Sequence, residues 1–113
     1  MSIEVPLSDL PQTVEPCSWC FVVTSGPSGA HVLSLSPTWS TAGEAVFATG
    51  SGRLKANVVS SEVATMVYPP FVDGELEGYS LIVDTAAVIG DDGHLHCKPL
   101  RAVWHRPAPP AGK

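Results

Sequence analysis

Hydrophobic and polar positions alternate along much of this chain, with the two-residue period of half-buried β-strands. The run His31-Val32-Leu33-Ser34-Leu35-Ser36 is one example. Other runs are rich in aromatic and β-branched residues, which fit the pleated surface of a sheet. From these patterns we expect strands at residues 19–24, 31–36, 44–49, 63–68, 79–89 and 94–105. Six strands separated by regular turn signals are typical of an antiparallel barrel or sandwich.

A single segment, residues 53–62, has a helical pattern. Leu54 and Val58 are four residues apart and therefore lie on one side of a helix, with Val59 beside them. The tetrad Gly90-Asp91-Asp92-Gly93 is a strong hairpin signal between the last two strands. We therefore expect a mainly β fold with one short helix.

The length of 113 residues suits one domain. Residues 1–16 form a weakly patterned N-terminal segment in which residues 8–10 have the composition of a short helical turn. Residues 17–106 contain all the expected strands, and residues 107–113 form a proline-rich tail. A barrel of six strands has little interior room for a ligand. A cofactor is therefore expected outside the barrel or between two subunits.

Composition narrows the classes of partner. The formal net charge of −5 argues against nucleic-acid binding, because that requires a basic face. No apolar run is long enough to span a membrane, and the start Met1-Ser2-Ile3-Glu4 lacks the cations of a signal peptide. We expect a cytoplasmic protein with no nucleic-acid or membrane partner. Because 44% of the residues are apolar and only 15% are charged, a second copy is expected to cover part of the surface in a homodimer.

The three cysteines form an odd number, which weakens a disulfide interpretation. Cys17 and Cys20 have the spacing of a zinc or redox pair, and His94, His96 and Cys97 are further candidate ligands. In a strand, however, residues three apart point to opposite faces, and Cys20 lies in an apolar run where cysteine behaves as a small hydrophobe. We expect no metal site, and we expect the histidines beside the hairpin to be solvated.

The segment from Thr49 to Val58 carries the strongest chemical signal. A strand end, a turn with two glycines and a helix start meet there, and Arg53 and Lys55 are two of only six Lys and Arg residues. Backbone N–H groups and the positive end of the helix dipole converge at such a junction, which therefore suits an anion. The alternative interpretation is a surface turn with solvated charges.

This junction combines hydroxyl residues at a strand end with a lysine, and then an asparagine followed by a hydrophobic residue. These positions are Thr49, Ser51, Lys55 and the pair Asn57-Val58. In this order they resemble the pyridoxamine-phosphate-oxidase-like flavoproteins, which have an FMN-binding split barrel. Residues 30–39 look like that family's second strand and residues 78–88 like its fifth. The resemblance implies a six-stranded antiparallel split β-barrel, in a short form of the family.

The resemblance also implies a cofactor site. In this family two subunits pack their barrels together and hold two flavins in the grooves between them, so FMN is expected, with a deazaflavin as the alternative. The implied contacts are Arg53 and Lys55 with the phosphate, Thr49 and Ser51 as hydroxyl donors, Ser34 and Ser36 against the flavin ring, and Asn57. Ser34 and Ser36 equally fit a solvent-facing strand edge, and Asn57 equally fits a local hydrogen bond inside the helix.

The chain departs from the family's pattern in three ways. It has no match to the C-terminal residues that complete the pocket in longer members, and a second phosphate-binding arginine is not obvious. Arg101 or Arg106 of a second subunit is a candidate for that role. No general acid or base stands out, since His31, the histidine nearest the site, is expected to be structural. Tyr68 and Trp39 are candidate walls of the site, although aromatic residues at strand ends more often belong to a core or an interface.

The expected function is that of an FMN-dependent oxidoreductase. Its small-molecule substrate and its catalytic residues are unknown. A non-catalytic flavin- or deazaflavin-binding module is the alternative, and it suits the missing acid or base.

Overall fold

The chain forms one curled antiparallel sheet with two short helices, and the structure, a computed structural model, describes residues 2–107. The strands are β1 (Ser2–Glu4), β2 (Cys20–Gly26), β3 (Gly29–Leu35), β4 (Thr38–Trp39), β5 (Ala45–Phe47), β6 (Val63–Tyr68), β7 (Ser80–Ile89) and β8 (Leu95–His105). The helices are α1 (Leu10–Thr13) and α2 (Gly52–Ser61), and a 3₁₀ turn, η1 (Leu7–Asp9), precedes α1. Residues 108–113 of the expected tail lie outside the described residues.

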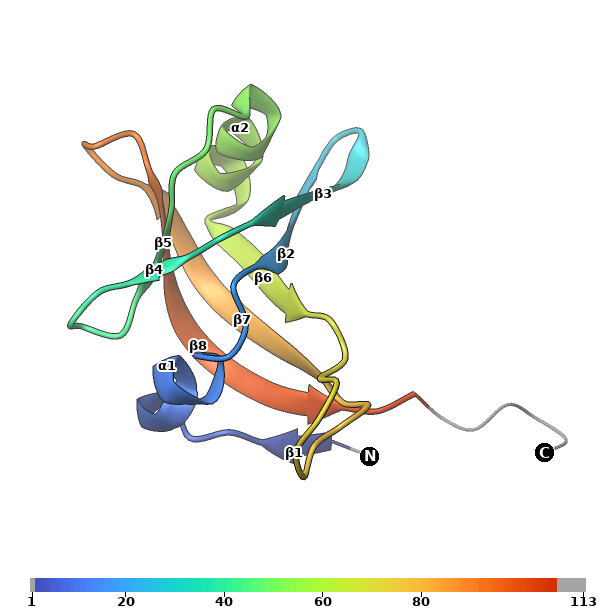
Figure 1. Cartoon of the computed structure of the whole chain (residues 1–113). Coiled ribbons are helices and arrows are strands. Elements are labelled where there is room, and N and C mark those ends of the chain that lie inside the picture. The colour runs from blue at the N-terminus through green and yellow to red at the C-terminus, as the bar shows by residue number, and fades with distance from the viewer. Residues whose placement is uncertain (1, 108–113) are drawn as a thin grey trace, which may run out of the picture.

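The hydrogen-bonded ladder runs in the order β3-β2-β6-β7-β8-β5-β4, and β1 pairs with the C-terminal part of β8. Its two edges, β3 and β4, are consecutive in the chain. Residues 29–39 thus pair with β2 at one edge and with β5 at the other. Figure 1 shows this run of chain crossing from the β2 side of the molecule to the β5 side. The ladder is therefore an open half-barrel whose two edges are joined by the chain itself.

The structure confirms the expected mainly β, antiparallel architecture but corrects the strand count from six to eight. The additional strands β1 and β4 have only three and two residues, too few to show an alternation. The expected turn at residues 8–10 is present as part of η1 and α1, so there are two short helices rather than one. No helix in the described part of the chain is long and apolar enough to cross a membrane.

The inner face of the curl forms the hydrophobic core. Alternate residues of the long strands are buried there, as in β7, where Leu81 and Val83 are fully buried. Leu10 and Val14 are also buried, so the N-terminal segment contributes to the same core. Burial of each such side chain stabilises the fold by roughly 1.5–3 kcal/mol. The core therefore fills the interior of the barrel, so a ligand site is expected on its outside or at its ends.

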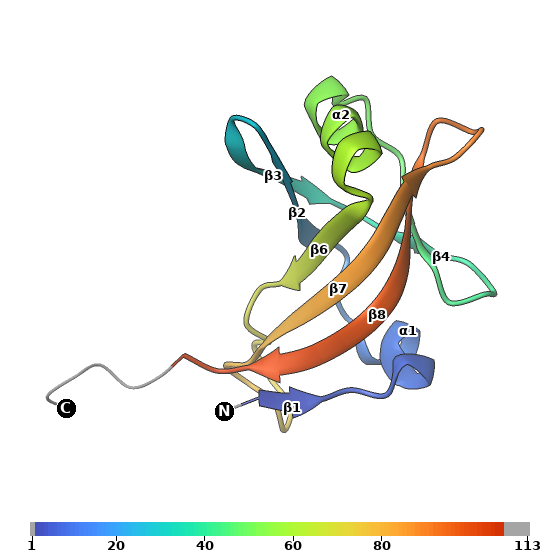
Figure 2. The same ribbon diagram turned by 180° about the vertical axis from the view of Figure 1, so that it is seen from behind.

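The outer face of β6, β7 and β8 is turned toward the viewer in Figure 2. Directly paired residues of neighbouring strands share a face. The register therefore places Phe21, Val67, Ile82 and Val103 in one row across the outside of the sheet. Each of the four is half-buried, and Trp19, which is 40% exposed, packs edge-on against Phe21. This outer apolar row, Phe21, Val67, Ile82 and Val103, is thus available for contact with another surface.

Helix α2 lies at one end of the half-barrel, between the β2–β3 hairpin and the β7–β8 hairpin (Figures 1 and 2). It begins after Ser51, whose hydroxyl accepts a hydrogen bond from the N–H of Leu54 and so caps the helix. It ends at Glu62, which has a left-handed conformation with φ of 62°. Leu54 and Val58 are buried, as their spacing predicts. The expected helix and its buried side are confirmed.

Candidate functional site

Two hydroxyl groups organise the turn before α2. Thr49 Oγ1 accepts a hydrogen bond from the N–H of Ser51 (3.1 Å), and Ser51 Oγ accepts one from the N–H of Leu54 (3.2 Å). Each hydroxyl keeps its own proton for donation to a ligand. The N–H groups of Gly52 and Arg53 have no hydrogen-bond partner within residues 2–107. Two backbone donors are therefore free at the positive end of the helix dipole.

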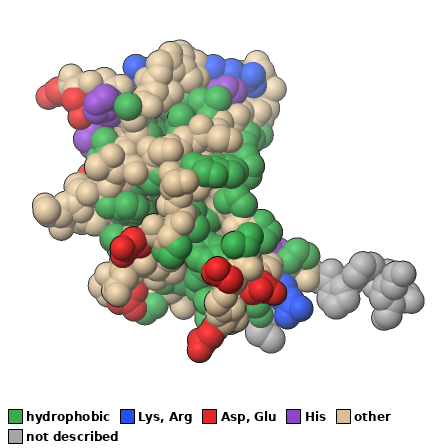
Figure 3. Space-filling model, viewed as in Figure 1, with side chains coloured by type: hydrophobic (Ala, Val, Ile, Leu, Met, Phe, Trp, Pro, Cys, Tyr) green, Lys and Arg blue, Asp and Glu red, His purple; other side chains and the backbone are tan. Residues whose placement is uncertain are grey.

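Space and charge at this turn also suit an anion. Gly50 and Gly52 have nothing within 4 Å of the position that a Cβ would occupy, so the turn is open there. Arg53 is exposed and Lys55 is half-buried, and neither makes an ion pair with a described carboxylate. Figure 3 shows basic side chains at the upper end of the molecule, the end at which α2 lies. Of the expected cofactor residues, Thr49 and Ser51 lie at this turn, and Arg53 and Lys55 follow on the first turns of α2, where residues two apart point to different sides of the helix.

Asn57, by contrast, faces the interior. It is 6% exposed, and its Nδ2 donates a hydrogen bond to Thr24 Oγ1 on β2 (3.2 Å). Its Oδ1 lies so close to Gly26 that a Cβ on that glycine would overlap it. The bond is thus a tertiary contact rather than the local bond that was the alternative. In this structure Asn57 joins α2 to the β2–β3 hairpin, and a flavin contact for it stays a prediction.

His31 lies beside this contact. It pairs with Thr24 across the β2–β3 ladder, and Thr24 accepts the hydrogen bond from Asn57 of α2. The Nδ1 atom of His31 is buried and has no hydrogen-bond partner in the described chain. A buried polar atom without a partner is costly and calls for a water, an ion or a ligand. The sequence predicts a structural histidine here, and that role stays a prediction, with one ring nitrogen buried and unpartnered in the described chain.

The remaining expected residues lie elsewhere. Ser34 and Ser36 are exposed, and Ser34 pairs with Phe21 on the outer face of the sheet, away from the turn before α2. Their contact with a flavin ring stays a prediction. Of the two aromatic candidates for a wall, Tyr68 is completely buried in the core and Trp39 is half-buried against it. Tyr68 therefore belongs to the core rather than to an exposed site.

The cysteine positions offer little chemistry. Within the described residues no group of three or more His, Cys, Asp or Glu is placed to hold a metal ion, and all three thiols are free. Burial raises the pKa of Cys20 to about 12 and that of Cys97 to about 11, and it also raises the pKa of Cys17. Thiols with a raised pKa are poor nucleophiles and poor metal ligands. Cys20 and Cys97 therefore act as small core residues.

A groove of about 580 Å³ lies between α2 and the β7–β8 hairpin. Its walls are mainly apolar, and four ionisable side chains line it: Glu44, Glu62, His96 and Lys98. The sequence does not predict this groove, because its walls come from segments that are far apart in the chain. The one available signal is the Asp–His spacing of four residues across the predicted hairpin.

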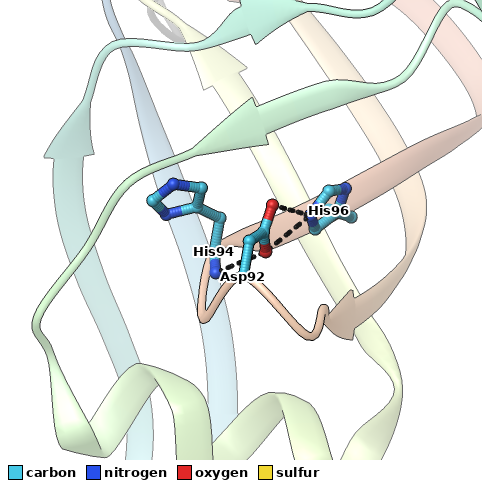
Figure 4. A network of polar contacts seen from close by, with 3 residues as sticks. All are labelled: Asp92, His94 and His96. Atoms are coloured by element: carbon cyan, nitrogen blue, oxygen red, sulfur yellow. Dashed lines mark hydrogen bonds and ion pairs between the residues drawn. The ribbon is translucent and has the colours of Figure 1, made fainter.

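Asp92 and His96 form a polar contact at this hairpin (Figure 4). Both carboxylate oxygens of Asp92 lie 3.0 Å from His96 Nε2. The pKa of the Asp92 carboxyl is lowered, first by the hydrogen bond from the backbone N–H of His94 and then by the contact with His96. An ionised carboxylate only accepts hydrogen bonds, so Nε2 carries the proton. His96 is thus held by Asp92, where the sequence predicts a solvated histidine.

Comparison with known proteins gives a similar fold but no family. No protein-family model matches the chain, and no curated protein sequence does. Among solved structures, the FAD binding protein from Mycobacterium smegmatis has a similar fold, with a TM-score of 0.63 and 15% sequence identity. The match covers 92% of this chain and 97% of that protein's chain. At this identity the similarity establishes the half-barrel fold alone.

Proposed function

We propose that this protein binds FMN, with the flavin phosphate at the turn before α2, and that it is a flavin-dependent oxidoreductase. The observation that carries the proposal is the combination of donors at that turn. Free backbone N–H groups, two hydroxyls and two cations without an ion-pair partner in the described chain lie within a few residues of one another. Each of these groups is of a kind that binds phosphate.

The donors differ in what they contribute. Arg53 is suited to a bidentate contact with two phosphate oxygens, and Lys55 to a single charged contact. Lys55 is half-buried, so its charge is screened less than that of an exposed lysine. The formal charges of Arg53 and Lys55 sum to +2, which is enough to balance one phosphate group.

The fold supports a flavin as the ligand. The similar half-barrel from Mycobacterium smegmatis is an FAD binding protein. FMN and FAD share the flavin ring and the phosphate next to it, so one turn suits either. FMN is favoured over a deazaflavin here, because the longer acidic tail of a deazaflavin would need a more basic groove than six Lys and Arg residues provide.

We also propose that the site is completed in a homodimer. The outer apolar row offers a contact surface for a second copy, and Trp19 extends it. Ser34 pairs with Phe21, the first residue of that row, and so lies at its edge. A flavin ring held between two subunits at this edge would therefore meet the hydroxyl of Ser34. This arrangement accounts for a serine that lies away from the phosphate-binding turn.

In this proposal a bound flavin supplies the hydride or electron transfer. The chain itself anchors the phosphate, orients the ring and excludes water. None of the residues at the turn before α2 is a general acid or base, and this feature favours a non-catalytic flavin-binding module as the second candidate.

The test compares FMN with riboflavin, which lacks the phosphate. Each flavin is titrated into the purified protein, and binding is followed by the change in flavin fluorescence. We expect FMN to bind at least tenfold more tightly, since a charged hydrogen bond contributes about 1.5–3 kcal/mol. Lys55→Ala and Arg53→Ala should reduce that preference and leave riboflavin binding unchanged. Lys98→Ala is the control for loss of a positive charge, because this exposed lysine lies on β8 and not at the turn.

Equal affinity for FMN and riboflavin would overturn the phosphate site, and no binding of FMN, FAD or deazaflavin would overturn the function. If light scattering shows a monomer, the groove shared between two subunits is excluded, but the phosphate site is not. Anaerobic addition of NADPH to the FMN-loaded protein separates the two candidates. Bleaching of the flavin supports an oxidoreductase, and retained yellow colour with every reductant tried supports the binding module.

A further inference from the structure

The groove between α2 and the β7–β8 hairpin has the size and lining of a small-molecule site. Its volume of about 580 Å³ lies within the range of about 300–1,000 Å³ that is usual for such sites. The apolar walls are formed by Val58, Val59, Ala86, Val88 and Ile89. Val59 and Val88 are 72% and 60% exposed, so two large apolar side chains line the hollow without cover. An apolar ligand group would shield both.

Charged side chains of both signs line the same groove. The carboxylates are Glu44 and Glu62, Lys98 is the cation, and His96 adds an imidazole ring. His96 and Lys98 are two residues apart on β8 and therefore point to one face of the sheet. Glu44 precedes Ala45, which pairs with Cys97, so Glu44 lies next to Lys98 in register. Opposite charges are thus arranged around apolar walls.

These charges are available to a ligand. Within residues 2–107, neither Lys98 nor the carboxylates Glu44 and Glu62 take part in an ion pair. A charge next to apolar walls that has no protein partner gains more from a ligand of opposite sign than a fully solvated charge does. Since both signs are present, a ligand that carries both would satisfy the groove better than an anion or a cation alone.

His96 adds a directed acceptor. Asp92 holds its Nε2–H, and Gly90 leaves room for the ring, because a Cβ at that position would lie 2.8 Å from Nε2. The other ring nitrogen, Nδ1, points away from Asp92 in Figure 4. In the neutral ring this nitrogen accepts a hydrogen bond. Asp92 is therefore a positioning residue that fixes which nitrogen of His96 is left for a ligand.

We propose that this groove binds a small zwitterion with an apolar side chain, of the class of the hydrophobic amino acids. Lys98 pairs with the ligand carboxylate. Glu44 and Glu62 pair with its ammonium group, and His96 Nδ1 accepts one of the ammonium hydrogens. The apolar side chain lies against Val59 and Val88 and removes their surface from water.

The groove is distinct from the phosphate-binding turn, although the two are close along α2. Lys55 and Val59 are four residues apart, so they lie one above the other on the same side of the helix. The proposal does not rest on flavin binding, because neither the probe nor the variants below involve a phosphate or a flavin. Either proposal can therefore fail while the other stands.

The test uses L-phenylalanine and two analogues that each lack one charge, phenethylamine and 3-phenylpropanoate. Binding to the purified protein is measured by calorimetry, and the site is located from the amide NMR shifts of residues 86–89. We expect phenylalanine to bind at least tenfold more tightly than either analogue, with shifts confined to the groove. Equal binding of all three compounds, no saturable binding of phenylalanine, or shifts elsewhere would each overturn the proposal.

Charge variants provide a sharper check. Lys98→Gln should reduce phenylalanine affinity to that of phenethylamine and leave phenethylamine binding unchanged. Glu62→Gln should weaken the binding of phenethylamine and leave the binding of 3-phenylpropanoate unchanged. Asp92→Asn should weaken the ligands with an ammonium group, because it frees the His96 ring to turn. Arg101→Gln, on the same strand but outside the groove, is the matched control, and an equal effect from it would contradict the assignment.

Discussion

Asn57 of α2 and Thr24 of β2 are joined by a buried hydrogen bond of 3.2 Å, and this bond connects the helix to the hairpin across 33 residues of sequence. Gly26, two residues further along β2, leaves the space that the Asn57 side chain occupies. An asparagine that resembles a family's cofactor residue thus helps to pack α2, and a flavin contact for it stays a prediction. The relationship ties the position of the turn before α2 to the β2–β3 hairpin.

This packing predicts that Gly26→Ala is destabilising. A Cβ at Gly26 would overlap Asn57 Oδ1, and relief requires the loss of the bond to Thr24. We expect a loss of roughly 1–3 kcal/mol in the free energy of unfolding, measured by urea denaturation. Gly50→Ala is the control, because nothing lies within 4 Å of its Cβ position, and it should be nearly neutral. In an Asn57→Ala background the Gly26→Ala penalty should shrink, and a penalty that persists there would contradict the overlap.

The cap of α2 gives a second prediction. Ser51→Ala removes the acceptor for the N–H of Leu54 and should cost about 1 kcal/mol of stability. Ser60→Ala, at an exposed position inside the same helix, should be neutral or slightly stabilising because alanine is a better helix former. Thermal melts of the two variants measure the difference. Equal melting temperatures would mean that the Ser51 hydroxyl does not hold the helix start.

The buried thiols predict a loss of stability in alkali. Cys20 and Cys97 have a pKa of about 12 and about 11 in the folded chain, against about 8.5 for an ordinary thiol. Above the ordinary value the unfolded chain binds fewer protons than the folded one, so stability falls as pH rises. Each thiol should reduce the free energy of unfolding by up to about 1.4 kcal/mol per pH unit between about pH 8.5 and its folded pKa.

Urea denaturation at several pH values between 7.5 and 10.5 measures this slope. Cys97→Ala should make the fall in unfolding free energy with pH shallower by the contribution of one thiol. This holds whatever the effect of the substitution on stability at pH 7.5. Cys17→Ala is the comparison, because Cys17 is only half-buried. Identical slopes in the wild-type protein and in Cys97→Ala would show that the Cys97 thiol does not remain protonated in the fold.

Much of the fold is predictable from the alternation of side chains. The strand expected at 63–68 coincides with β6, and the helix expected at 53–62 differs from α2 by one residue at each end. Each of these elements buries one face and exposes the other, so the spacing of apolar residues in its sequence indicates which face is buried. β1 is not predictable in this way, since a strand of three residues is identified only by its pairing with Trp104 and its neighbours on β8.

The candidate site shows the same division. The turn before α2 is local in sequence, and its donors are predictable from the residue types at a strand end and a helix start. The Asn57–Thr24 bond and the unpartnered nitrogen of His31 depend on how distant segments pack, so no local pattern indicates them. The Asp92–His96 contact lies between these cases. The two residues are close in sequence, but the groove that gives the contact its proposed role is formed by distant segments.

The crossing of residues 29–39 from one edge of the sheet to the other has a mechanical consequence. Within the described chain no hydrogen-bonded ladder joins β3 to β4, so only the covalent link through Ser36 and Pro37 closes the ring. Within residues 2–107 the outer sides of β3 and β4 already lack a ladder partner, and the link holds these two edges near each other. A proteolytic nick there would let the edges move apart, and unprotected edges recruit strands from other molecules. The closure of this half-barrel therefore depends on one short connection.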